Sequence, residues 1–226
     1  MDTRRLTILL SSGAFKALTS SEEPNEFIPK TETGNNVRDL FTWVVIPIAI
    51  VLIIRIFLLG FYIVPSGSML DTIQLRDRVI AVKIEKPKRG DIVVFRDPGG
   101  WLSASEGEDL IKRVIGLPGD TVECAGNGQP VKVNGVALNE SAYLKPGVTP
   151  SDVAFSVKVK PGMMWVMGDN RSSSADSRMH QTDAYGGQVP LSLVRGVARV
   201  TYWPVSRWGL MDSHPEVFSK VPNVSS

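Results

Sequence analysis

The sequence predicts a mainly β protein, a coiled antiparallel β-sheet of barrel-like form preceded by one transmembrane helix. Three observations carry this prediction. One apolar run, residues 41–64, is long enough to cross a membrane. The residues after it contain short β-branched and aromatic runs, each bounded by Gly, Pro, Asn or Asp. Among them, Val133-Asn134-Gly135-Val136 is typical of a two-residue hairpin turn.

Residues 1–40 are predicted to be a disordered tail. Ser, Thr, Glu, Pro and Asn dominate residues 19–36, which show no apolar periodicity. Arg4 and Arg5 precede a short apolar run over residues 6–10, as in a secretory signal. That run is too brief for a signal sequence, so we interpret it as a false signal or a short helical turn.

Residues 41–64 are predicted to form a transmembrane helix that is retained as an anchor. Spanning the hydrocarbon takes about 20 apolar residues, and this run supplies them with two exceptions, Pro47 and Arg55. Pro47 lies near the start, where a kink is tolerated, and Arg55 lies near enough to the end to reach the headgroups. Trp43 and Tyr62 lie near the two ends, as interface aromatic residues do. The charges around the run do not indicate an orientation.

Residues 65–226 are predicted to form a β-rich domain, with an inserted hairpin subdomain at roughly 116–160. A turn at residues 87–91 separates the first two strands. The predicted strands are residues 78–84, 91–95, 111–115, 121–123, 131–133, 154–159, 163–167 and 194–201.

Composition and charge exclude several classes of protein. The 25 Lys and Arg residues nearly balance the 23 Asp and Glu residues, so nucleic acid is not a predicted partner. The single cysteine, Cys124, excludes an intrachain disulfide and is interpreted as a small buried apolar residue. With no thiol pair and only His180 and His214, the sequence shows no zinc-binding pattern, and we predict neither a metal nor a cofactor.

The segment directly after the apolar run is the strongest candidate for chemistry. Pro65-Ser66-Gly67-Ser68-Met69 contains two serines, and a serine hydroxyl needs a neighbouring base to act as a nucleophile at neutral pH. Histidine is the usual base, and spacing alone leaves His180 open, whereas His214 lies in an irregular C-terminal stretch.

Lys112 is the other candidate base. A neutral amine can accept the serine proton if burial among apolar neighbours lowers its pKa toward about 7–8. If Lys112 faces inward on a strand, Leu110 and Val114 share its side. A strand lysine taken alone is more often a solvent-facing residue.

Four motifs then follow one another in order. They are Pro65-Ser66-Gly67-Ser68-Met69, Arg89-Gly90-Asp91-Ile92-Val93-Val94-Phe95, Lys112-Arg113-Val114 and Gly168-Asp169-Asn170-Arg171-Ser172-Ser173-Ser174-Ala175-Asp176-Ser177-Arg178. In this order, and with Pro118-Gly119-Asp120 between the last two, they closely resemble bacterial type I signal peptidase. The resemblance covers roughly residues 41–208 and implies the signal peptidase fold and a membrane-bound serine endopeptidase.

The resemblance implies a Ser–Lys dyad. Ser68 would be the nucleophile and Lys112 the general base. The side chain of Ser66 and the backbone N–H of Ser68 would form the oxyanion hole, where charge develops in the tetrahedral intermediate.

It also implies supporting residues around the dyad. Ser174 would hydrogen-bond and orient the lysine amine, and Asp176 with Arg178 would form a supporting ion pair. Asp169 and Arg113 would hold the motif loop near the dyad.

The implied substrate is a preprotein signal peptide with small residues at the −1 and −3 positions, bound in extended form by main-chain hydrogen bonds. The implied setting is the cell membrane, with the N-terminus cytoplasmic, the peptidase domain extracytoplasmic, and the lipid bilayer and secretion translocon as partners. The expected shallow apolar pocket is formed by Val64, Met69, Leu70, Leu110 and Ile111.

The chain departs from the family pattern in three places. Asp71 stands where a proline is usual, and Ser172 and Ser173 replace a common Asp-Asn pair. The segment over residues 179–187 is longer than its counterpart in compact members of the family. Residues 99–108 are predicted to be a flexible hairpin end beside the strand that carries Lys112.

Two alternatives remain. One is a self-cleaving repressor of the related Ser–Lys fold, which the apolar run and the lack of a DNA-binding helix pair disfavour. The other is a membrane-tethered β-barrel binding module or inactive scaffold, which the complete set of motif residues disfavours.

Overall fold

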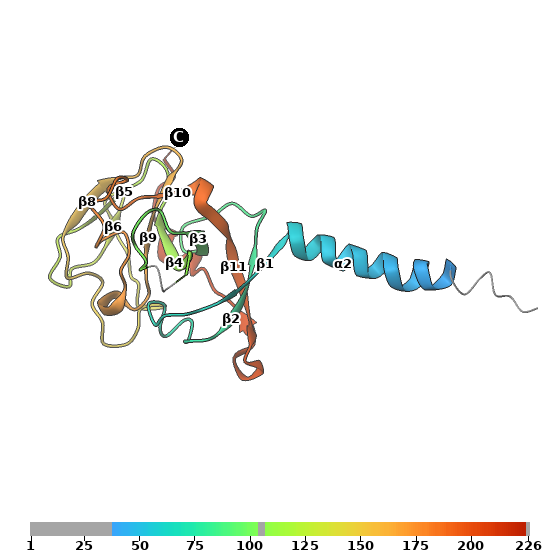
Figure 1. Cartoon of the computed structure of the whole chain (residues 1–226). Coiled ribbons are helices and arrows are strands. Elements are labelled where there is room, and N and C mark those ends of the chain that lie inside the picture. Colours follow the sequence, from blue (N-terminus) through green and yellow to red (C-terminus); the bar gives the residue numbers. More distant parts are fainter. Residues whose placement is uncertain (1–37, 104–106, 225–226) are drawn as a thin grey trace, which may run out of the picture.

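The computed structural model describes residues 38–103 and 107–224, so nearly all of the predicted tail, residues 1–40, lies outside the described residues. The described chain contains one long N-terminal helix and two antiparallel sheets. Figure 1 shows the helix projecting from a strand-rich body beside β1, β2 and β11, while β5, β6 and β8 lie at the opposite side of the body.

The apolar run forms a continuous helix from Arg38 to Phe57, 20 residues long. It contains a π-helical turn, η1 (Phe41–Val45), followed by α2 (Ile46–Phe57). Pro47 lies in the first turn of α2, where its missing N–H and its ring favour a widened turn before it. At about 1.5 Å per residue the helix is about 30 Å long, enough to span the hydrocarbon of a bilayer.

The helix ends at Phe57, whereas the sequence predicts helix through residue 64. Residues Leu59–Ile63 instead form strand β1, which pairs antiparallel with β2 (Arg78–Val82). A short apolar run is compatible with either helix or strand, and here the hydrogen bonds to β2 decide the outcome.

The end of the helix is bonded directly to the sheet. The backbone N–H of Lys83, just after β2, donates to Leu58 O (2.9 Å), and the Lys83 ammonium donates to Ile56 O (2.8 Å). A lysine at this position satisfies free carbonyls and favours the helix dipole. The Arg55 guanidinium also lies over the ring of Phe61, 5.1 Å from its centroid.

The larger sheet has eight strands in the order β1-β2-β11-β3-β4-β9-β10, with β12 paired to β11. The predicted mainly antiparallel architecture is confirmed, but in the described residues β1 and β10 remain the two ends and no barrel closes. The remaining strands of this sheet are β3 (Ile92–Arg96), β4 (Asp109–Gly116), β9 (Met163–Met167), β10 (Val189–Pro190), β11 (Val194–Trp203) and β12 (Gly209–Leu210).

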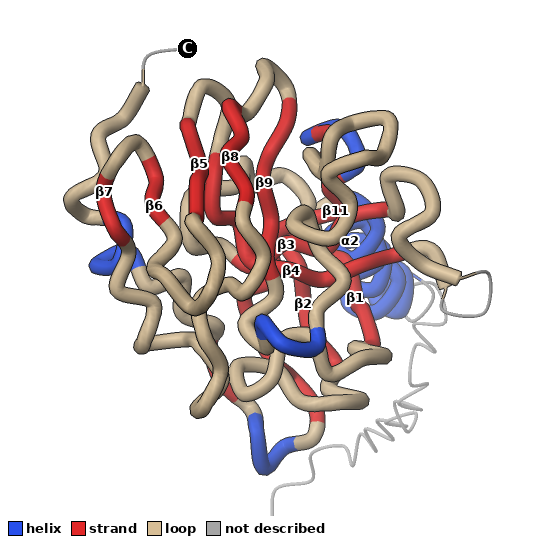
Figure 2. The backbone as a smooth tube through the Cα atoms, turned by 90° about the vertical axis from the view of Figure 1, so that its left-hand side faces the viewer, coloured by secondary structure: helices blue, strands red, loops and turns tan. Residues whose placement is uncertain are grey.

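The smaller sheet has four strands in the order β7-β6-β5-β8 and is formed by the chain between β4 and β9. Its hairpin turns at Asn134 and Gly135, which have φ angles of 52° and 80°. Two consecutive positive φ values define a type I′ turn, so the hairpin predicted here is confirmed. The strands are β5 (Thr121–Cys124), β6 (Lys132–Val133), β7 (Val136–Ala137) and β8 (Phe155–Lys158). Figure 2 shows this sheet beside β9.

The alternation of side chains along β3 separates two parts of the core. Ile92 and Val94 pack with one buried cluster, whereas Val93 and Phe95 pack with another, which also contains Leu110 and Val114 of β4. The chain between strands forms short 3-10 helices: η2 (Arg171–Ser173), η3 (Leu191–Leu193), η4 (Val205–Arg207) and η5 (Pro215–Phe218).

Candidate active site

Ser68 and Lys112 meet at the start of the peptidase domain. Ser68 lies in the turn after β1, and Lys112 lies in the middle of β4, opposite Val93 of β3. Lys112 Nζ and Ser68 Oγ are hydrogen-bonded at 2.7 Å, and the two residues are only 4% and 5% exposed. The structure therefore places the predicted pair in direct contact inside the protein.

Burial lowers the pKa of Lys112 to about 8. The negative charges of Asp176 and Asp169 act in the opposite direction, and the positive charge of Arg178 adds to the lowering. A neutral amine is therefore accessible close to neutral pH, as a general base requires.

Ser66 lies on the exposed side of the same turn, and its hydroxyl donates to Ser68 Oγ at 3.4 Å. The turn is held from the other side by Asn170, whose backbone N–H donates to Ser68 O (3.0 Å) and whose side-chain amide donates to Gly67 O (2.9 Å). Asn170 thus fixes the turn by bonding to the carbonyl oxygens of Gly67 and Ser68. The sequence does not predict this contact.

Gly168 allows the motif loop to approach the serine turn closely. A Cβ atom at this position would lie 2.5 Å from Ser68 O and would overlap the Ser174 hydroxyl. Ser174 Oγ is buried and makes no hydrogen bond of normal geometry among the described residues, although its hydroxyl helps to lower the pKa of the Asp176 carboxyl. The predicted hydrogen bond from Ser174 to Lys112 is therefore absent in this structure, although both residues flank the same serine turn.

Asp176 and Arg178 form the predicted ion pair. Arg178 donates two hydrogen bonds of 2.9 Å to the Asp176 carboxylate, and the N–H of Gly168 donates a third of 3.0 Å. Burial alone would raise the pKa of Asp176, but the bonds and charge of Arg178 hold it below its usual range. Both side chains are buried, so the pair keeps an ionised carboxylate close to Lys112.

Arg113 and Asp169 form a second buried pair. The guanidinium donates to both carboxylate oxygens, at 2.8 and 2.7 Å, and Thr72 donates to Asp169 at 2.5 Å. Because Arg113 follows Lys112 on β4 and Thr72 follows the serine turn, this pair connects the two segments that carry the dyad. The holding role expected for both residues stays a prediction.

A third buried pair, Glu140 with Arg171, was not predicted. Arg171 Nη1 donates to the Glu140 carboxylate at 3.0 Å, and Arg171 Nε donates to Gly168 O at 3.0 Å. The Tyr143 hydroxyl donates to Glu140 at 2.7 Å, and the Tyr143 ring lies 4.3 Å below the Arg113 guanidinium. The segment after β7 therefore supports the motif loop, and no local pattern marks Glu140 for this role.

A pocket of about 210 Å³ opens beside Ser66, Ser68 and Lys112. Of the five residues predicted to form the substrate pocket, Leu110 lines it. Val64, Met69 and Ile111 belong to the buried core cluster behind it, and Leu70 packs over Gly67. The rest of the lining is Pro65, Trp101, Leu102, Ser173 and Ala175.

The two histidines have other contacts. His180 stacks on Trp101, and its Nδ1 lies 2.9 Å from Asp176 O. His214 Nδ1 lies 3.0 Å from the Glu216 carboxylate. Lys112, and not His180, is thus the candidate base that the structure brings to Ser68.

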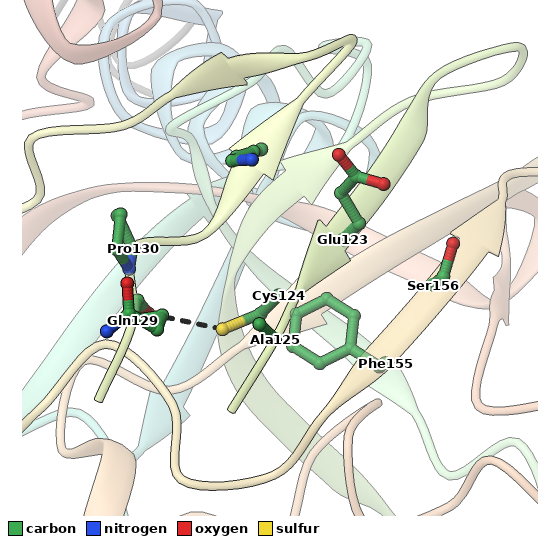
Figure 3. Close-up of a pocket in the computed structure, with 8 residues that line it drawn as sticks. Glu123, Cys124, Ala125, Gln129, Pro130, Phe155 and Ser156 are labelled. Carbon is green, nitrogen blue, oxygen red and sulfur yellow. Dashed lines mark hydrogen bonds between the residues drawn. The ribbon is translucent and has the colours of Figure 1, made fainter. Parts of the chain in front are cut away.

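A second hollow, of about 330 Å³, lies on the smaller sheet, where Cys124 contributes to its wall. Figure 3 shows the thiol pointing toward Gln129, whose carbonyl oxygen it contacts at 3.1 Å. Cys124 is buried, as predicted, and this hollow shares no lining residue with the pocket beside Ser68 and Lys112.

Comparison with known proteins identifies the class. A family model described as signal peptidase, peptidase S26, matches residues 37–203. Signal peptidase I of Mycobacterium tuberculosis is 31% identical, over 90% of this chain and 83% of its own. Probable signal peptidase I-2 of Synechocystis sp. is 41% identical, over 72% of each chain. These sequence matches show that the chain is related to peptidases.

A solved signal peptidase I from Enterococcus faecalis V583 is 33% identical to this chain. It aligns over 50% of this chain and 97% of the other, with a TM-score of 0.37. On the extent of the sequence matches, the chain belongs to the signal peptidase family, peptidase S26.

Proposed function

We propose that this chain is a membrane-anchored serine endopeptidase that removes signal peptides from exported preproteins after small residues. Ser68 is the nucleophile and Lys112 the general base. The observation that supports this most directly is the buried 2.7 Å contact between Ser68 Oγ and Lys112 Nζ. Membership of the signal peptidase family supplies the substrate class.

In the proposed reaction, the neutral amine of Lys112 takes the proton of Ser68 as Oγ attacks the carbonyl carbon of the scissile bond. The Ser66 hydroxyl and the N–H of Ser68 stabilise the resulting oxyanion. As the bond breaks, the Lys112 ammonium returns its proton to the leaving amine of the mature protein. Water activated by the same amine then hydrolyses the acyl-enzyme and releases the signal peptide.

The fold suits an extended substrate. β1 is an end strand of the larger sheet and leads directly into the serine turn. A peptide that pairs beside this turn can present its carbonyl to Ser68 while a small side chain enters the pocket. The charges of the buried pair Asp176 and Arg178 would act on the amine of Lys112.

The membrane setting is supported by the helix and by the surface around it. The 20-residue apolar helix has no buried side chains in the described protein. Phe61, Ile63, Trp203 and Leu210 are exposed on β1, β11 and β12, and Figure 1 places β1 and β11 beside the helix. We therefore infer a bilayer-facing side. From the likeness to signal peptidases we propose that the N-terminus is cytoplasmic and the domain extracytoplasmic, where the secretion translocon would deliver substrates.

The test is cleavage of a preprotein by the detergent-solubilised protein. We expect a shortened product from the wild-type chain and a loss of at least about 10³-fold in Ser68→Ala and Lys112→Met. Ser156→Ala and Lys86→Met, at exposed positions away from the pocket, serve as matched controls and keep wild-type rates.

A binding module without activity would give no product from any variant. Near-wild-type cleavage by folded Ser68→Ala or Lys112→Met would contradict the dyad. Circular dichroism and thermal unfolding of each variant separate loss of chemistry from loss of fold.

A further inference from the structure

The wall of the pocket beside Ser68 contains a tryptophan that the motifs do not assign. Trp101 and Leu102 lie on the loop between β3 and β4 and face the same pocket as Leu110. We propose that Trp101 determines specificity: its indole closes the pocket and limits the size of the substrate side chain that lies beside Ser68. This inference rests on the proposed function, because it concerns the residue immediately before the cleaved bond.

The loop that carries Trp101 is fixed through its backbone by Asp97. The Asp97 carboxylate accepts hydrogen bonds from the N–H groups of Gly99 (3.0 Å), Gly100 (3.2 Å), Trp101 (3.1 Å) and Leu102 (3.3 Å). Gly99 and Gly100 have positive φ angles, which let the chain turn around the carboxylate. Trp101 is therefore held at its main chain by one charged group.

The indole is fixed as firmly as the backbone. Its N–H donates to the Asp183 carboxylate at 2.8 Å, and Asp183 in turn accepts two backbone N–H groups of its own loop, at 2.8 and 2.9 Å. The ring stacks on His180 with a centroid distance of 4.4 Å and an interplanar angle of 12°. The Phe95 ring lies in a T-shaped arrangement with the indole, with a centroid distance of 6.1 Å, and only 6% of Trp101 is exposed.

These contacts give the long loop over residues 179–187 a function. His180 and Asp183 lie on it, and His180 Nδ1 contacts Asp176 O, so the segment that supports Lys112 also positions the pocket wall. A wall packed on several sides cannot move aside for a larger substrate. It rejects large side chains instead of adapting to them, and Ala or Gly remain as substrates at this position.

The test compares two peptides that differ only in the residue before the cleaved bond, Ala or Leu. We expect the wild-type chain to prefer Ala by about 100-fold or more in kcat/KM, and Trp101→Ala to reduce that ratio at least about tenfold. Trp101→Phe should reduce it by a smaller factor. Met179→Ala, on the same loop but with an exposed side chain outside the pocket, is the matched control and keeps the wild-type ratio.

A binding measurement covers the case in which Trp101→Ala fails to fold. The uncleaving Ser68→Ala chain is titrated with the Ala peptide while tryptophan fluorescence is recorded. We expect a change on binding, of which at least half disappears when Trp101→Phe is added to Ser68→Ala. An unchanged fluorescence response in that double variant overturns the inference.

The two proposals fail in different ways. If the wild-type chain does not cleave the Ala peptide, the proposed function is wrong and this inference falls with it. If the wild-type chain cleaves both peptides equally well, or if folded Trp101 variants keep the wild-type ratio within twofold, only the inference about Trp101 is overturned.

Discussion

At the scale of single residues, the charges around Lys112 explain why its amine can be neutral. In the described part of the chain, each buried carboxylate near the dyad is bonded to an arginine. The pairs are Asp176 with Arg178, Asp169 with Arg113, and Glu140 with Arg171. Burial has the largest effect and lowers the pKa of Lys112 to about 8, whereas Asp176 and Asp169, each paired with an arginine, still act to raise it.

The pH dependence of cleavage follows from this arrangement. Because only the deprotonated amine accepts a proton, the rate should rise about tenfold per pH unit below pH 8 and level off above it. Arg178→Met removes a positive charge that lowers the pKa of Lys112 and leaves the opposing charge of Asp176 unpaired. We expect its pH–rate profile to move about one unit higher.

Single-turnover rates between pH 6 and 10 measure both profiles. Arg178→Lys keeps the charge, so its pH–rate profile should lie close to that of the wild type. Arg96→Met, at an exposed position, should leave the profile unchanged. A profile that does not move in folded Arg178→Met would show that this arginine does not act on the amine.

The sequence alone predicts the pair Ser68 and Lys112 because they lie in short motifs whose order is specific, and the structure brings the two side chains together. It does not identify Glu140 or Trp101. Their partners are 31 and 82 positions away, at Arg171 and Asp183, and no local periodicity predicts which distant residues will meet. Three of the five predicted pocket residues lie in the core because apolar type indicates burial, not access to a pocket.

At the scale of elements, the runs of β-branched residues predict most strands to within two residues. The error lies at Leu59–Ile63, where the apolar run continues past the helix and the sequence shows no boundary. Pairing with β2 and the bonds from Lys83 end the helix, and both depend on residues further along the chain. The sequence also does not predict β10 and β12, because each has only two residues and forms by pairing with another strand.

The segment after β7 should matter for stability through Glu140. In Glu140→Gln, the buried Arg171 loses its counter-charge, so we expect the free energy of unfolding to fall by about 3–5 kcal/mol. Urea unfolding measures the change. Glu108→Gln breaks an exposed ion pair with Arg96 and should cost less than about 1 kcal/mol. Equal effects of the two substitutions would contradict a supporting role for the buried pair.

At the scale of the whole molecule, the join between helix and sheet sets the position of the active site. One residue, Leu58, separates α2 from β1, and Lys83 bonds to both Leu58 and Ile56. In a bilayer this join would hold Ser68 at a constant height above the lipid. A signal peptide would then be cut at a set distance from its own apolar segment.

Inserting a six-residue Gly-Ser linker after Leu58 tests this coupling. With a soluble peptide in detergent, we expect cleavage within about twofold of the wild-type rate, because the pocket is unchanged. With preproteins in liposomes, we expect additional products cut further from the apolar segment, detected by mass spectrometry. The same linker placed in the turn between β6 and β7 should give only the wild-type product. A single product from the Leu58 insertion would show that the join does not select the bond.

The short passage from α2 to β1 also affects rotation. A domain on a loose tether turns about its anchor, and each productive encounter with a substrate must then remove that rotational freedom at a cost in entropy. Here the freedom is lost once, during folding, so encounters in the plane of the membrane do not repeat the cost. A preprotein that diffuses within the membrane plane would reach the pocket only from the side of the protein on which the pocket opens. Approaches from other directions would be unproductive.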